Sequence, residues 1–186
     1  MYFDEKRLAD GLRRGQTTAQ EMFLRQYAPT VFRQIVRMTR DERDAEELTQ
    51  DTLLKALNHI DAFNPARAGM QTWLCRIAYR LTLNHLRVPK PPLISIDEAA
   101  NPLTMEDERQ MNQLFEESDN EMTHWLLQAI DLLPHDEQTL ITLFYYDDLP
   151  IRDIAYITDA PPGTIATRLH RIRKKLFNLV LKLQQP

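Results

Sequence analysis

Apolar residues recur every three to four positions along most of the chain, which is the spacing of one face of an α-helix. The pattern begins at Leu8 and continues to Met38, and it predicts further helices over about 43–60 and 70–87. No stretch alternates apolar and polar residues between hairpin turns, as β-strands do. The sequence therefore predicts an all-α fold.

The helical pattern lapses between 88 and about 117. Four prolines and seven acidic residues fall in this stretch, a composition typical of a linker. Helical periodicity resumes after Ser118, which forms a capping-box pattern with Glu121. We therefore expect two small helical domains over 1–88 and 118–186, joined by an acidic, proline-containing linker over 89–117.

The net charge of the chain is −4, but basic and acidic residues are strongly segregated along the sequence. Residues 1–93 hold 15 basic and 11 acidic side chains, residues 94–160 hold 2 and 16, and residues 161–186 hold 6 and none. Two basic tracts around an acidic one indicate two anion-binding surfaces. The alternative is a set of solvated helix faces.

Composition excludes several classes of protein. The four glycines form neither a GxGxxG nor a Walker pattern, and a single cysteine, Cys75, excludes a disulfide framework or a cysteine zinc cluster. The five histidines lack metal-ligand spacing, so we expect no metal, no cofactor and no catalytic residue. Without a membrane-length apolar run or a signal peptide, a soluble cytoplasmic protein is expected.

The segment from Leu149 to the C-terminus predicts a helix-turn-helix. A short helix begins at Pro150, Ala-Pro-Pro-Gly at 160–163 ends it, and a longer helix follows. The inward stripe of the second helix is Ile165, Leu169, Ile172, Leu176 and Val180. Its other face carries hydroxyls and cations but no acid, which suits the DNA major groove. The alternative is a basic helix that packs on an acidic partner.

Two N-terminal segments also indicate partners. The helix over 43–60 has an outward stripe that suits docking on a basic helix pair of another protein: Glu47, Gln50, Asp51, Leu54 and Asn58. The alternative is a solvated face with one exposed leucine. Segment 63–87 places Trp73 and Tyr79 among arginines, as single-stranded DNA binding requires. A core position is the alternative for both rings and the preferred interpretation for Trp73.

These segments together resemble a bacterial extracytoplasmic-function sigma factor. The resemblance rests on DAEELTQDTLLKA, then FNP…WLCRIAYRLTLNHLR, then LPHDEQTLITLFYYDDLPIRDIAYITDAPPGTIATRLHRIRKKL, and covers about 4–87 and 120–178. It implies a first domain that binds the β′ clamp helices of core RNA polymerase and captures a melted −10 element. It implies a second domain that reads the −35 element of promoter DNA as duplex and contacts the β flap. An anti-sigma factor is a further implied partner.

The resemblance also implies roles by motif position. Polymerase docking would fall to Asp44, Glu47, Gln50, Asp51 and Leu54. Capture of the −10 element would fall to the 63–72 loop, with Asn64 and Arg67, and to Arg76, Arg80 and Arg87. Reading of the −35 element would fall to Arg152, Thr164, Ala166, Thr167, Arg168, His170 and Arg171.

The sequence departs from the family pattern at three positions. Arg80 stands where an Asn is usual, Asn84 where an Asp is usual, and Ala166 where a Lys is frequent. Two other functions remain open at this point. One is a helix-turn-helix regulator that binds duplex DNA without polymerase, and the other is a metal hydrolase built on the acidic cluster at 41–51.

Overall fold

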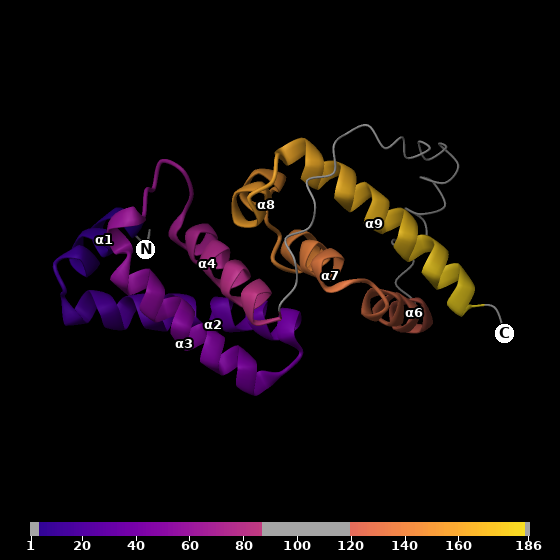
Figure 1. Ribbon diagram of the computed structural model, residues 1–186, viewed down its shortest axis with the longest axis horizontal. Helices are drawn as coiled ribbons and strands as arrows, with labels where there is room; N and C mark the ends of the chain where they lie inside the picture. Colours follow the sequence, from indigo (N-terminus) through magenta and orange to yellow (C-terminus); the bar gives the residue numbers. More distant parts are fainter. Residues whose placement is uncertain (1–3, 87–119, 185–186) are drawn as a thin grey trace.

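The computed structural model describes residues 4–86 and 120–184. These residues form α-helices without a strand, which confirms the all-α prediction (Figure 1). The first stretch holds α1 (Glu5–Arg13), α2 (Thr17–Thr39), α3 (Glu42–Asn58), a 3-10 turn (Ile60–Ala62) and α4 (Met70–His85). The second holds α6 (Asn120–Asp131), α7 (His135–Ile141), a π-helical turn (Thr142–Tyr146), α8 (Ile151–Thr158) and α9 (Pro162–Leu183).

Residues 4–86, the N-terminal unit, pack α2, α3 and α4 around one apolar core. Phe23, Ile35, Met70 and Leu74 are completely buried there. The apolar periodicity of 43–60 predicts an inward face, and every residue of it is buried or partly buried because α3 lays that face on α2 and α4: Ala45, Leu48, Thr52, Leu53, Ala56, Leu57 and Ile60. Asp41 caps α3 by accepting the N–H of Asp44.

Residues 120–184, the C-terminal unit, contain the expected helix-turn-helix. Asp159 ends α8 in the left-handed conformation (φ 62°), and Pro162 occupies the first turn of α9. All five residues of the predicted inward stripe of α9 are buried. The expected capping box of Ser118 and Glu121 lies outside the part of the chain whose side chains the structure describes.

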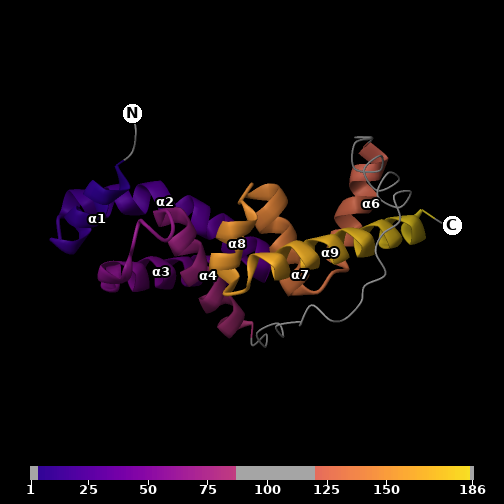
Figure 2. The ribbon, with the colours of Figure 1, turned by 90° about the horizontal axis from the view of Figure 1, so that it is seen from above.

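The two units pack against each other along α4 and α8, which lie side by side in both views (Figures 1 and 2). Four apolar side chains of the N-terminal unit join the core of the C-terminal unit: Met38, Cys75, Tyr79 and Leu83. Within the described ranges, no helix is both long and apolar enough to cross a membrane.

Candidate nucleic-acid interface

The outward stripe of α3 is exposed as expected. Glu47, Gln50 and Asp51 face solvent, and Leu54 is 58% exposed among them. Asp44 is partly covered because its carboxylate lies 2.9 Å from Nε2 of His85, at the end of α4. The helix therefore presents an acidic face with one apolar side chain near its middle.

The loop between the 3-10 turn and α4 exposes Asn64 and Arg67. The Asn64 side chain accepts the N–H of Ala66 at 3.0 Å and so closes a local turn. Phe63, at the start of the loop, is buried against Trp73, with ring centroids 5.4 Å apart. The loop is thus an exposed, polar segment between two buried anchors.

Trp73 and Tyr79 are both buried, so the hypothesis that they form a platform for single-stranded DNA is wrong for this arrangement. Trp73 faces the core of its own unit, the preferred interpretation from the sequence. Tyr79 packs in the cluster shared with the C-terminal unit, where burial raises the pKa of its hydroxyl. Sequence periodicity could not place Tyr79 because its partners lie beyond the linker.

Arg76 and Arg80 point at the C-terminal unit. Each donates to the carboxylate of Asp159 at 3.0 Å, in the turn of the helix-turn-helix. The Arg76 guanidinium also donates to the Tyr156 carbonyl at 2.9 Å and lies 4.5 Å from the centre of that ring. The structure therefore pairs these two arginines with a protein carboxylate. Arg87 lies outside the described residues.

Part of the expected reading face of α9 is exposed. Ala166 and Thr167 face solvent in its first turns, and His170 and Arg171 are half-buried farther along. The Thr167 hydroxyl donates to the Gly163 carbonyl at 2.9 Å. The Arg152 side chain, on α8, is 86% exposed. These residues form a polar surface at the start of α9.

A position on the exposed reading face of α9, which the −35 assignment requires of Thr164 and Arg168, is wrong for both. Thr164 is buried, and the Arg168 side chain is only 11% exposed because it donates to Asp136 of α7 at 2.6 Å. Both positions directly precede the inward residues Ile165 and Leu169, so they lie at the edge of the buried stripe. Sequence reasoning missed this pair because α7 lies more than twenty residues before α9.

The contact between the units joins arginines on one side to aspartates on the other. Arg37 donates to Asp147 at 2.9 Å, and Arg40 donates to Asp131 at 2.9 Å. Burial raises the pKa of the Asp147 carboxyl, and the nearby Arg37 guanidinium offsets part of that rise. Asp159 adds its two arginine pairs, and Thr72 donates to Asp153 at 3.0 Å. Arg40 also donates to the Gln138 side chain at 2.8 Å. The segregation of charge in the sequence was a signal for this contact.

No group of three or more potential metal-ligating side chains comes together among residues 4–86 and 120–184. The acidic residues at 41–51 instead cap α3 or face solvent, apart from the partly covered Asp44.

Comparisons with known proteins agree with the order of these surfaces. The model of Sigma-70 region 2 matches residues 23–89, and that of Sigma-70, region 4 matches residues 123–176. The ECF RNA polymerase sigma factor SigW of Bacillus subtilis is 32% identical over 155 residues, covering 81% of this chain and 82% of SigW. The ECF RNA polymerase sigma-E factor of Escherichia coli K12 is 31% identical over 148 residues, or 75% of each chain.

Solved structures show the same fold. CnrH, solved in complex with the cytosolic domain of CnrY, superposes with a TM-score of 0.67 at 18% identity, covering 97% of this chain and 99% of CnrH. RpoE of Bartonella quintana, solved with the anti-sigma factor NepR, gives 0.59 at 21% identity, covering 89% and 98%. With two sigma-70 regions in order and relatives above 30% identity, the chain belongs to the ECF RNA polymerase sigma factors.

Proposed function

We propose that this chain binds core RNA polymerase through α3 and directs it to specific promoters. The observation that carries the proposal is the exposed Leu54 at the middle of an acidic helix face. Such a face complements a basic helix pair, which the β′ clamp helices would supply. The residues at the contact would be Asp44, Glu47, Gln50, Asp51 and Leu54.

The −35 element would be read by the first turns of α9. Ala166 and Thr167 are exposed where a recognition helix meets base edges, and Arg152, His170 and Arg171 flank them as donors for bases and phosphates. Arg168 would hold α9 against α7 through Asp136, so we assign it a supporting role. A small side chain at Ala166 leaves room for a thymine methyl group.

The −10 element would be captured by the expected 63–72 segment together with Arg76 and Arg80. Because α4 begins at Met70, the loop itself covers residues 63–69. Elements near −35 and −10 lie about 25 base pairs, or roughly 85 Å of duplex, apart. Because α4 touches α8 in this structure, both elements could be engaged only after the two units separate. Promoter binding would therefore require the Asp159 contacts to break.

An anti-sigma factor is proposed as a further partner. CnrH and RpoE of Bartonella quintana were each solved with another protein bound, and NepR is an anti-sigma factor. A protein that stabilised the packed arrangement would keep the two promoter-binding surfaces together and so prevent initiation.

The substitution Leu54→Arg tests polymerase docking. It should reduce binding to core RNA polymerase by at least about tenfold, since a charge in a central contact is strongly unfavourable. Fluorescence anisotropy of labelled protein titrated with core enzyme measures the affinity. Leu24→Arg is the matched control, because Leu24 is an exposed leucine of α2 in the same unit. A stand-alone regulator would be favoured instead if the Leu54 variant bound core enzyme as well as the unmodified chain does, and if the chain alone bound duplex DNA tightly.

A further inference from the structure

We propose that α1 positions the −10 loop through two side chains, Glu5 and Arg13. This inference rests on the proposed function of the 63–69 loop. The Sigma-70 region 2 match begins at residue 23, so neither side chain belongs to the matched region. Both would act through the backbone of the loop and would not touch DNA themselves.

Glu5 fixes the end of the loop. Its carboxylate accepts the backbone N–H of Met70 at 3.0 Å and the hydroxyl of Tyr27 at 3.3 Å. The N-cap of α4, Gly69, has no side chain to satisfy the first N–H groups of that helix, so Glu5 supplies this from α1. Its negative charge also suits the positive end of the α4 dipole.

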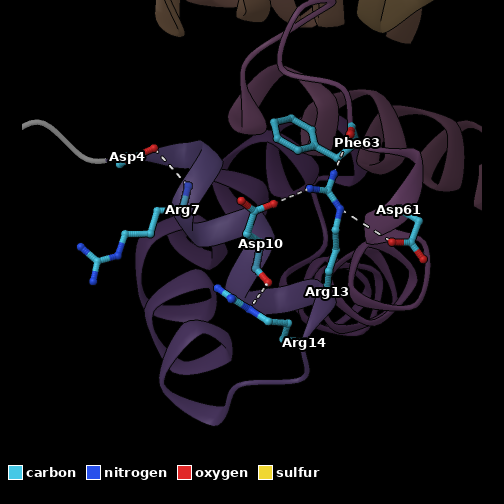
Figure 3. A network of polar contacts seen from close by, with 7 residues as sticks. All are labelled: Asp4, Arg7, Asp10, Arg13, Arg14, Asp61 and Phe63. Carbon is cyan, nitrogen blue, oxygen red and sulfur yellow. Dashed lines mark hydrogen bonds and ion pairs between the residues drawn. The ribbon is translucent and has the colours of Figure 1, made fainter.

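Arg13 fixes the start of the loop. Its guanidinium donates to the Phe63 carbonyl at 3.1 Å and to Asp10 at 2.9 Å, and it lies 3.7 Å from Asp61 (Figure 3). One side chain thus connects α1 with the 3-10 turn and the first residue after it. The planar guanidinium, with several donors in a fixed geometry, suits this combination of two hydrogen bonds and one ion pair.

The two contacts hold the loop from opposite ends. Leu8 and Leu12 bury the other face of α1 in the core, so the side chains that hold the loop stand on a fixed helix. The segment between the two contacts is mostly exposed, and its hydrogen bonds are local: the Asn64 side chain accepts the N–H of Ala66, and the Asn64 carbonyl accepts the N–H of Arg67 at 3.0 Å. Capture of an unstacked base requires a loop placed to within a fraction of an ångström. Loss of either contact would misplace the loop while leaving the α3 face intact.

The test compares two properties of the full chain assembled with core polymerase. Promoter opening is measured by permanganate reactivity of −10 thymines, at a promoter selected by in-vitro transcription of a genomic library with the unmodified chain. Core binding is measured by anisotropy. Glu5→Ala and Arg13→Lys should each lower promoter opening at least about tenfold, because a misplacement near 1 Å can cost up to about a hundredfold. Core binding should change less than about twofold.

Two further variants separate positioning from general stability. In Glu5→Gln the amide carbonyl can still accept the Met70 N–H, and the amide N–H can donate to the Tyr27 hydroxyl. This variant should therefore open the promoter nearly as well as the unmodified chain does. Arg14→Met is the control for Arg13, because the Arg14 guanidinium donates to the Asp10 carbonyl of its own helix. Arg13→Lys retains the charge and the aliphatic stem, which favours a folded variant.

The outcomes are distinct. The inference would be overturned if the Glu5→Ala and Arg13→Lys variants opened the promoter as well as the Arg14→Met variant does. A parallel loss of core binding and opening would also overturn it, because α1 would then merely stabilise the unit. Failure of the proposed function differs from both, since the unmodified chain would then open no promoter.

Discussion

Asp159 offers the sharpest test of the packed arrangement, because its single carboxylate holds both Arg76 and Arg80. The substitution Asp159→Asn removes the charge and keeps a residue that tolerates the left-handed backbone at this position (φ 62°). If the same arginines serve the −10 element, the carboxylate competes with DNA phosphates. Its removal should raise the affinity for single-stranded −10 DNA.

The size of the effect follows from the exposure of the partners. Asp159 and Arg80 are each 47% exposed and Arg76 is 23% exposed, so each ion pair contributes at most about 1 kcal/mol. A combined loss of about 1 kcal/mol changes the ratio of packed to separated units roughly fivefold. The apparent affinity for single-stranded −10 DNA scales with the fraction of molecules whose units are separated. This affinity should therefore rise by up to about fivefold.

Two measurements check this prediction. Anisotropy of a labelled single-stranded −10 oligonucleotide gives the affinity. The alkylation rate of Cys75 reports separation of the units, because this thiol is buried in the cluster that they share. Both should increase by a similar factor. Asp148→Asn is the matched control, since Asp148 is an exposed aspartate with positive φ (50°) in the same unit.

Equal oligonucleotide affinities and equal Cys75 alkylation rates for Asp159→Asn and Asp148→Asn would contradict the prediction. A higher oligonucleotide affinity without faster Cys75 alkylation would also contradict it. In that case the lost charge would act on DNA directly, without separating the units.

Three further predictions concern single side chains. Arg171→Ala should weaken binding of the polymerase complex to −35 duplex by about 1–3 kcal/mol in a gel-shift titration, and unchanged affinity at physiological salt would contradict the recognition-helix assignment. Leu143→Ala should lower the free energy of unfolding by about 2–5 kcal/mol in urea, because Leu143 is completely buried. Cys75 should react with iodoacetamide at pH 8 far more slowly than an exposed thiol while the two units are packed, because burial raises the pKa of its thiol to about 12; rapid labelling of the native chain would contradict this.

Local pattern was sufficient for most of the secondary structure. The inward stripe of α9 and the outward stripe of α3 follow from the 3.6-residue period, and the structure places both as the sequence predicts. The helix-turn-helix was equally readable, because Pro150 and the Pro-Pro-Gly entry fix the ends of its helices locally. Family membership also follows from motifs in order along the chain.

Positions at the edge of a stripe were decided by tertiary contacts. Thr164 and Arg168 lie one residue before buried positions, and the pattern alone assigns them to the exposed face. Arg168 is covered because Asp136 of α7 is within hydrogen-bonding distance. An amphipathic pattern gives the direction of a face, but the width of its buried part depends on the helix that packs there.

The positions of the helices and the apolar face of each can be predicted from the amino-acid pattern, because those properties depend on neighbours three or four residues away. The contacts of Arg76, Arg80 and Tyr79 depend on the packing of the two units, because each has partners that follow the linker. The contact that holds the end of the 63–69 loop also depends on packing, because Glu5 lies 65 residues before Met70. Contacts over such separations depend on how helices pack, and a local period of apolar residues carries no information about that packing.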